Sequence, residues 1–223
     1  MEYFELHHRL KTAFDTGVDC HLPDLGISIT HHSFFSQGAN DYLPGSHHLY
    51  CKQHDCCFES EYYRTIDDLG LPDSDVDCNV HFPYHILQPL GEPKAKGVVI
   101  LIHGLNEKKW EKYLPWAHGI ATATGKAVVL FPIAFHMSRA PEIWSSRREM
   151  FPIAAKRAAD FPDNSETSYV NAAISTRLDA FPQRLFWSGL QTYNDVVQLI
   201  TDIRGGAHPT ISPQARVDLF GYS

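Results

Sequence analysis

The sequence lacks a long apolar run. Its longest stretches, Val98 to Ile102 and Ala127 to Phe135, fall short of the roughly 20 residues that a helix needs to span a bilayer. An apolar leader of the secretory kind is also absent, because residues 1–5 carry acid early and Lys11 and Asp15 follow soon after. We therefore expect a cytoplasmic protein without a membrane span.

Basic residues are neither in excess nor gathered in a run. The chain has 19 Lys and Arg against 26 Asp and Glu, a formal charge of -7, which argues against a nucleic-acid partner. We expect a small-molecule partner instead. The five cysteines are an odd number and all lie within residues 1–78, so reduced thiols are expected rather than a disulfide framework.

Histidines, by contrast, number 14, and several lie among the cysteines. Six of these residues have the ligand types of a zinc site: His47, His48, Cys51, His54, Cys56 and Cys57. Their spacing matches no standard zinc motif, so we interpret them as surface histidines with partly buried thiols and expect no metal or cofactor. A metal-binding module in the N-terminal region remains an alternative.

What the sequence does have, from about residue 79, is a regular alternation of apolar strands and amphipathic helices. Continuous apolar runs at 97–102 and 127–131 are typical of buried parallel strands, and a third such strand is expected at 216–220. Residues 80–86 instead alternate as a half-buried strand does. The pattern predicts an α/β fold, a mostly parallel sheet with flanking helices that is incomplete at the C-terminus.

Two helices are expected between these strands. The first carries Trp110, Tyr113, Leu114, Ala117 and Ala121 on one face, and Pro115 should kink it or end it early.

The second presents one apolar face before Gly205-Gly206 stops it. The residues of that face are Tyr193, Val196, Val197, Ile200 and Ile203.

The predicted core spans residues 79–223. Residues 1–78 are an N-terminal extension or a small added region, in which 26–30 could form a strand and 61–69 a partial helix. The connection that contains Trp144 and Trp187 is much longer than usual for a sheet–helix loop, so an inserted lid or cap is predicted at about 138–187.

Two short motifs follow predicted strands. Gly221-Tyr222-Ser223 follows the last strand, and His103-Gly104-Leu105 follows an earlier one, before a helix that Asn106 would cap. In this order and context the sequence resembles the α/β-hydrolase superfamily over about residues 80–223, an uncharacterised branch that stops at the nucleophile elbow.

The resemblance implies roles for these residues. Ser223 would be the nucleophile, supported by Gly221 and Tyr222, and the backbone N–H of Leu105 would help to hold the oxyanion. His103 and Gly104 would support that loop, with His103 in a structural role. The second donor, the acid and the catalytic histidine of the family would all follow Ser223.

Three interpretations of this ending remain open. The chain is truncated, which we favour; or the remainder after Ser223 is a separate chain held as a partner; or the protein is short and inactive. The third would leave the apolar faces of residues 217–220 poorly covered. The chain by itself should be inactive.

The leading functional prediction is a serine hydrolase that acts on an ester, or an amide or thioester, through an acyl-enzyme. The alternative is a catalytically inactive, hydrolase-like binding or scaffolding protein, because fold alone does not establish function. His136, after the strand at 127–131, and Trp144 are candidates for lining a substrate pocket. A histidine that is simply hydrogen-bonded at a strand end is the other interpretation of His136.

Overall fold

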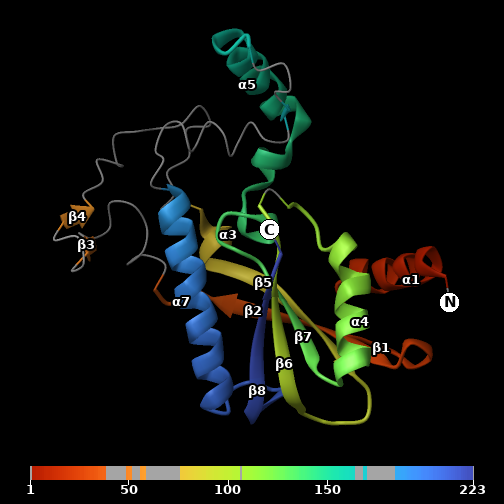
Figure 1. The fold of residues 1–223 in the computed structure, drawn as a ribbon. Helices are drawn as coiled ribbons and strands as arrows, with labels where there is room; N and C mark the ends of the chain where they lie inside the picture. Colours follow the sequence, from red (N-terminus) through yellow and green to blue (C-terminus); the bar gives the residue numbers. More distant parts are fainter. Residues whose placement is uncertain are drawn as a thin grey trace. The chain divides into compact units, whose positions relative to one another are not determined.

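The computed structural model describes residues 2–38, 49–51, 56–58, 76–105, 107–163, 168–169 and 184–222 (Figure 1). Six strands form one sheet: β1 (Cys20–Leu22), β2 (Ile27–Phe35), β5 (His81–Pro89), β6 (Ala95–Ile102), β7 (Ala127–Phe131) and β8 (Ile211–Gly221). A two-stranded antiparallel ribbon pairs β3 (Leu49–Cys51) with β4 (Cys56–Phe58).

The α-helices are α1 (Tyr3–Asp15), α3 (Asp77–Val80), α4 (Leu114–Thr124), α5 (Arg147–Asp160) and α7 (Arg184–Arg204). Short 3-10 turns are η1 (Pro23–Leu25), η4 (Glu111–Tyr113), η5 (Met137–Arg139) and η6 (Glu142–Ser145). Sheet and helices together confirm the predicted α/β class.

The sheet is mixed, in the order β1-β2-β5-β7-β6-β8, and its parallel part is β7-β6-β8. β5 runs antiparallel to β7, and β1 antiparallel to β2. The chain moves from β6 to β7 on one side and then returns across β6 to β8. Since such crossovers are right-handed, α4 and α7 should cover opposite faces of the sheet.

Burial agrees with that arrangement. Val98 and Ile100 of β6 share an apolar cluster with Val196 and Leu199 of α7. The side chains between them on the strand point to the other face, because successive strand residues alternate. α4 contacts β7 and α1 there, and Figure 1 shows α7 and the α4–α1 pair on different sides of the strands.

Two of the three strands predicted as buried are buried. The third, at 216–220, forms within β8, but β8 lies at the edge of the sheet with Leu219 61% and Phe220 42% exposed, so the prediction of burial was wrong there. β7 has the predicted bounds and is buried at every position, and β6 is buried over 97–101. β5 differs: its burial alternates only in its first half and is continuous from Tyr84 to Gln88. The prediction of a half-buried strand was therefore wrong for the second half, because β5 lies inside the sheet and not at its edge.

Both helix predictions need correction in detail. Pro115 does not kink a helix, because α4 begins at Leu114 and places Pro115 in its first turn, where the missing N–H has no partner to lose. On α7, Tyr193 and Val197 are exposed, whereas Leu199 is buried with Val196 and Ile203. Gly206, with φ 79°, follows the helix end as predicted.

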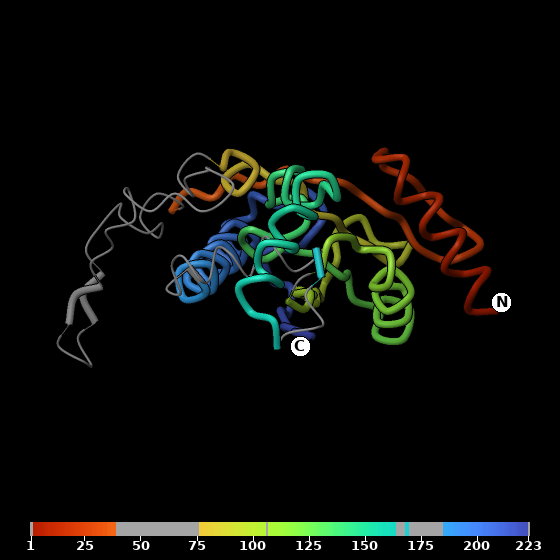
Figure 2. Tube along the Cα trace, turned by 90° about the horizontal axis from the view of Figure 1, so that it is seen from above, coloured from red at the N-terminus to blue at the C-terminus, as the bar shows by residue number. Residues whose placement is uncertain are grey.

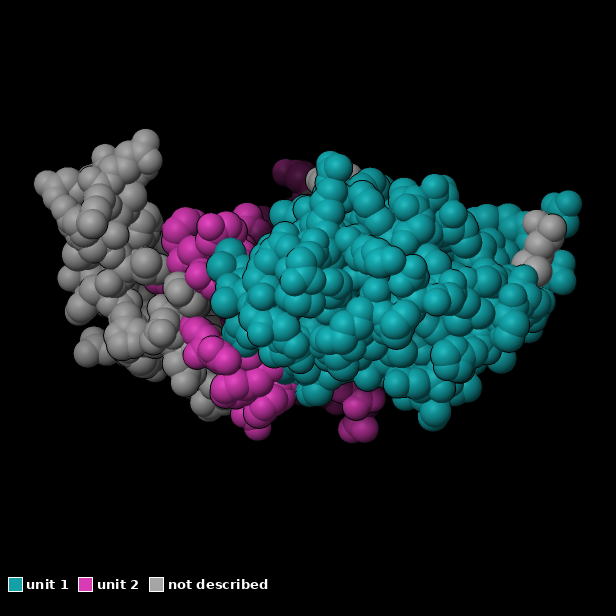
Figure 3. Space-filling model, turned by 90° about the horizontal axis from the view of Figure 1, so that it is seen from below, with its two compact units in different colours: residues 1–34, 82–133, 196–223 teal, residues 35–81, 134–195 magenta. Residues whose placement is uncertain are grey.

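The chain divides into two compact units, coloured separately in Figure 3: residues 1–34, 82–133 and 196–223, and residues 35–81 and 134–195. The first unit contains the buried centre of the sheet. The second has its own apolar cluster, in which Val76, Phe135 and Trp144 pack with Met150 and Ala154.

No helix in the described part of the chain is both long and apolar enough to cross a membrane.

Candidate active site

The two predicted motifs lie at the ends of neighbouring strands in the first unit. β6 and β8 are parallel and adjacent, with Ile102 opposite Gly221. Beyond that pair, the backbone N–H of Tyr222 donates to the carbonyl of Ile102 at 3.1 Å. A view onto the carboxyl ends of the strands shows the end of β8 beside the loop that follows β6 (Figure 2). Strand pairing thus brings together segments more than 100 residues apart in sequence.

Gly104 lies at the closest approach of these segments. A Cβ atom at this position would lie 3.1 Å from Cδ1 and 3.3 Å from the carbonyl oxygen of Tyr222, tighter than nearly all real contacts. The buried N–H of Gly104 donates to the Tyr113 hydroxyl at 2.9 Å. A side chain at this position would therefore require Tyr222 to shift by a few tenths of an ångström.

His103 is buried, and both ring nitrogens make hydrogen bonds. Nδ1 lies 2.8 Å from the carbonyl oxygen of Gly104, and Nε2 accepts the backbone N–H of Ile133 at 3.1 Å. A carbonyl can only accept, so Nδ1 carries the proton and the imidazole is neutral. His103 therefore links the end of β6 to the residues that follow β7.

The next residue, Leu105, is 63% exposed. Within the described residues, nothing accepts a hydrogen bond from its backbone N–H. A donor fixed by its neighbours at the end of a central strand suits an oxyanion or another acceptor on a ligand. Asn106, the predicted helix cap, lies outside the described residues.

An aromatic cluster lies beside Gly104. Tyr113, fully buried, contacts Trp110, Trp116 and Tyr222 edge to face, with ring centroids 5.7, 5.4 and 6.1 Å away. Trp116 and Tyr222 also contact each other, at 5.2 Å, and both keep part of their surface exposed. The cluster links the loop after β6 to the end of β8 and leaves an apolar surface facing solvent.

The positively charged Lys112 side chain lies over two rings of this cluster. Its ammonium lies 5.0 Å from the Tyr113 ring centroid and 4.7 Å from that of Tyr222, and it forms an ion pair with Glu107. The bond to Glu107 raises the pKa of Lys112. Burial raises the pKa of Tyr113, so its hydroxyl is neutral at physiological pH and can accept the Gly104 N–H.

The predicted nucleophile, Ser223, lies outside the described residues. Gly221, two residues earlier, has open space around it: a Cβ atom there would meet nothing within 4 Å among the described residues. The tighter approach is therefore at Gly104.

His136 and Trp144, the two candidates for lining a pocket, belong to the second unit. His136 is half-buried, and its Nδ1 lies 2.9 Å from the carbonyl oxygen of Ala134. It stands between Phe135 and Met137, whose φ angles of 62° and 49° are unusual for residues other than glycine. Trp144 is buried in that unit's apolar cluster, so core packing accounts for it.

The cysteine and histidine cluster cannot be placed as a site. His47, His48 and His54 lie outside the described residues, and for Cys51, Cys56 and Cys57 only the backbone of β3 and β4 is described. Among the side chains that the structure describes, no three His, Cys, Asp or Glu residues are grouped as a metal ion would require.

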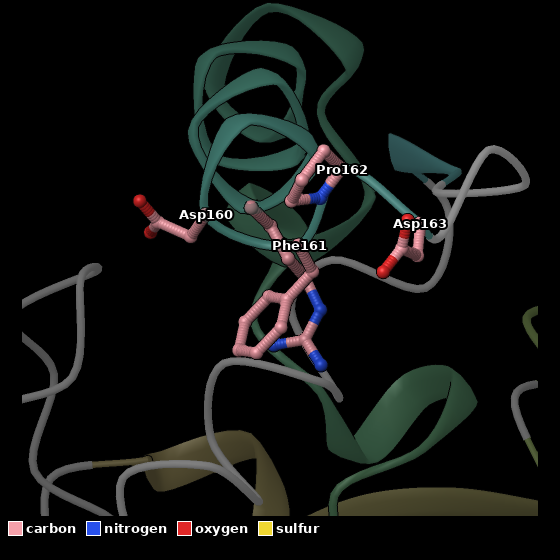
Figure 4. Close-up of a pocket in the computed structure, with 5 residues that line it drawn as sticks. Asp160, Phe161, Pro162 and Asp163 are labelled. Atoms are coloured by element: carbon pink, nitrogen blue, oxygen red, sulfur yellow. The ribbon is translucent and has the colours of Figure 1, made fainter.

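A hollow in the second unit lies at the end of α5 (Figure 4), lined by Arg157, Asp160, Phe161, Pro162 and Asp163. The Arg157 guanidinium lies over the Phe161 ring at 5.3 Å. None of the residues that the motifs single out lines this hollow, so we assign no chemistry to it.

Sequence reasoning missed what Tyr113, Trp116 and Lys112 do. Tyr113 was assigned to the apolar face of a helix, although its hydroxyl holds Gly104. Aromatic residues at 110, 113 and 116, three apart and directly after a His-Gly loop, are the signal that could have drawn attention to this surface.

Together these features define an α/β protein with a candidate active site at the carboxyl ends of two parallel strands. The chain belongs to a family of unknown function, DUF6051, whose model matches residues 1–223. Neither a curated protein nor a solved structure matches the chain.

Proposed function

We propose that the protein is a serine hydrolase of the α/β-hydrolase type that cleaves an ester, with an amide or thioester as a further possibility. One observation carries the proposal. The strand that precedes Gly-Tyr-Ser is the parallel neighbour of the strand that precedes His-Gly-Leu, with Ile102 opposite Gly221. A nucleophile and an oxyanion donor must lie on adjacent loops to act on one carbonyl group.

The proposed reaction has two steps. Ser223 Oγ forms a bond to the acyl carbon while its proton passes to a general base, and the leaving alcohol takes that proton as the C–O bond breaks. Water then attacks the acyl-enzyme, releasing the acid and restoring the serine. The Leu105 N–H would stabilise the oxyanion in both steps.

His103 is not the general base in this proposal. Its Nδ1 proton is committed to the Gly104 carbonyl and its Nε2 lone pair to the Ile133 N–H, so it has no lone pair for a hydroxyl proton. In the α/β-hydrolase superfamily the acid and the base follow the nucleophile in sequence.

The test is covalent labelling of the protein, purified from its source, with a fluorophosphonate probe. We expect labelling of Ser223 and its loss in Ser223→Ala. Ser212→Ala is the control, because Ser212 lies on the same strand, with its hydroxyl 2.9 Å from Gln214 Oε1. Absence of labelling in folded protein would reject the hydrolase and leave a hydrolase-like binding protein as the alternative.

A further inference from the structure

Two histidine rings meet beneath the N-terminal helix. His31 of β2 and His85 of β5 face each other with their Nδ1 atoms 2.8 Å apart. A single proton lies between two nitrogens at this distance, because one ring must donate and the other accept. The Phe14 ring of α1 contacts both rings, with its centroid 4.6 Å from that of His85 and 5.5 Å from that of His31. These two rings, the histidine pair, are therefore part of the surface on which α1 packs.

The sheet around the histidine pair offers little to balance a positive charge. Asp19, in the segment before β1, accepts the backbone N–H of His31 with Oδ1 at 2.7 Å. Burial lowers the pKa of His31, and the Asp19 carboxylate opposes this in part. Burial lowers the pKa of His85 to about 3, and like charges on His31 and His32 add to the effect. β7, the neighbour of β5, places Leu130 opposite His85.

The helices on this face of the sheet do not balance the charge either. On α1, the carboxylate of Asp15 forms an ion pair with Lys11. On α4, which packs against α1 and β7, His118 Nε2 lies 3.1 Å from a backbone carbonyl of η1. Neither helix contributes a charged group to the pKa of either ring of the histidine pair.

The histidine pair therefore accommodates a further proton poorly. His31 Nε2 is buried and has no hydrogen-bond partner among the described residues, so a proton there would form an N–H group cut off from water. A proton on the accepting Nδ1 would remove the lone pair that joins the two rings. On either ring the proton creates an imidazolium beneath Phe14, and such a charge is better hydrated once the Phe14 ring has moved away.

The other attachments of α1 are modest. Leu10 is the one fully buried residue of this helix. Ion pairs join α1 to Asp24 and to Glu111, and exposed pairs of this kind contribute little to stability. The helix lies beside α4 at the margin of the molecule's first unit (Figure 1). The contact of Phe14 with the histidine pair is therefore a substantial part of what holds α1 in place.

We propose that the histidine pair is a proton-sensitive contact that releases α1 from the sheet under mildly acidic conditions, while the central strands stay folded. Uncharged, the pair packs against Phe14. Charged, it takes up water and α1 detaches, which exposes Leu10, Phe14 and the surface that they cover. The proposal rests on contacts within the first unit and does not depend on hydrolase activity.

Hydrogen exchange of the peptide that spans α1, followed by mass spectrometry at pH 7 and pH 5, tests the release. After correction for the intrinsic exchange rates, we expect the opening constant of α1 to rise about 20-fold. The opened state binds protons near pH 6.5, whereas His85 in the closed state does so only near pH 3. His85→Leu should abolish the rise, and His8→Gln, at an exposed position on α1, should retain it. The peptides of β6 and β7 should stay better protected than α1 at both pH values.

A second variant keeps the proposal testable where His85→Leu does not fold. Phe14→Ala removes the ring that covers the histidine pair, so the His85 Cε1–H signal in NMR spectra should titrate at a higher pH than in the wild type. The proposal is overturned by an α1 opening constant that is the same at pH 7 and pH 5, or by equal protection of α1 and β6 at pH 5. Unchanged titration of His85 in folded Phe14→Ala would also overturn it.

Discussion

The Tyr113 side chain positions the loop that follows β6. Its oxygen accepts the Gly104 N–H at 2.9 Å, and its ring contacts Tyr222, so a single buried side chain touches both segments of the candidate active site. Leu105, whose N–H is the proposed oxyanion donor, is the residue after Gly104. A small shift of Gly104 therefore changes the direction of that donor.

We expect Tyr113→Phe to lower the free energy of unfolding by about 1–3 kcal/mol, because the buried Gly104 N–H loses its acceptor. In the proposed reaction kcat should fall about ten- to a hundred-fold with little change in KM, since the donor is misplaced while the substrate surface remains. Urea denaturation and steady-state kinetics measure the two effects.

Tyr84→Phe is the matched control. The Tyr84 hydroxyl bonds His208 Nε2 at 3.0 Å, so its loss should also destabilise the protein. It does not touch the loop after β6, and kcat should stay near the wild-type value. An equal fall in kcat in both variants would mean that Tyr113 acts through stability alone.

In the second unit, a buried ion pair joins distant segments. Arg139 is fully buried; its Nη2 lies 2.7 Å from Asp195 Oδ2 and also donates to the carbonyl of Asn79 at 3.0 Å. Burial lowers the pKa of Arg139 to about 10, which leaves it charged at neutral pH. Ser36 donates to the other Asp195 oxygen, completing the acceptor's hydrogen bonds.

Removing one member of this pair should be costly. We expect Arg139→Met to lower the free energy of unfolding by about 3–5 kcal/mol, because Asp195 is left buried without its counter-charge. Adding Asp195→Leu should recover part of that loss. Denaturant midpoints measure both, and a double variant less stable than Arg139→Met would argue against this explanation.

At this scale the sequence identified the motif residues but not the residues that support them. Gly104 and His103 were found because they follow an apolar strand directly. The contact of Tyr113 with Tyr222 depends on a pairing of segments formed only through the fold. Propensity and spacing carry no information on such contacts.

Among the elements, the central strands were predictable and the flanking ones less so. β6 and β7 are continuous β-branched runs because both faces of the sheet are covered there. α7 was found, but its buried face was misassigned: Tyr193 and Val197 fit the helical period as well as Leu199 does, and only packing distinguishes them. The order of the strands in the sheet could not be predicted, because it depends on pairing between distant segments and no local sequence pattern specifies it.

β2 and β5 carry a group of neighbouring histidines, of which His85 is buried and His31 and His32 are half-buried. His31 Nδ1 lies 2.8 Å from His85 Nδ1, so one of the two rings donates and the other accepts. His32 stacks on Tyr84 at 5.2 Å. Burial lowers the pKa of His85 to about 3 and that of His208, next to Tyr84, to about 4. These rings are therefore neutral in the folded protein at physiological pH.

This group makes stability depend on pH. Because the folded pKa of His85 lies below the unfolded value of 6.5, its stabilising effect is complete above pH 6.5 and is lost as the pH falls toward 3. Between pH 7 and pH 5, we expect the free energy of unfolding to fall by about 2 kcal/mol from His85 alone. Urea denaturation across that range measures the slope.

His85→Leu should flatten the slope, whereas His8→Gln, at an exposed position on α1, should leave it unchanged. His31 adds to the effect in the same direction, since burial also lowers its pKa, although Asp19 partly opposes this. Stability that does not change between pH 7 and pH 5 would contradict the assignment of neutral buried rings.

For the whole molecule, the notable feature is how the chain passes between its two units. It crosses at 34/35, 81/82, 133/134 and 195/196. Three of these crossings fall inside regular elements, namely β2, β5 and α7. α7 therefore contributes residues to both units, and unfolding of either unit would leave part of this helix without its packed face.

We therefore expect one cooperative unfolding transition. Ile100→Ala in the first unit and Met150→Ala in the second, both at fully buried positions, should each lower the free energy of unfolding by about 2–5 kcal/mol. Each should shift the same transition, because the shared elements couple the units. Fluorescence of Trp110 in the first unit and of Trp144 in the second, each followed in a variant without the other tryptophans, should report one midpoint.

Independent units would give a different result. Trp110 and Trp144 would then show separate midpoints, Ile100→Ala would move only the first, and Met150→Ala only the second. Two midpoints would also separate the tests of the candidate active site from those of the buried ion pair, since Tyr113 and Arg139 lie in different units. With a single midpoint, the units unfold together. Arg139→Met would then also raise the fraction of molecules in which the loop with Gly104 and Leu105 is unfolded.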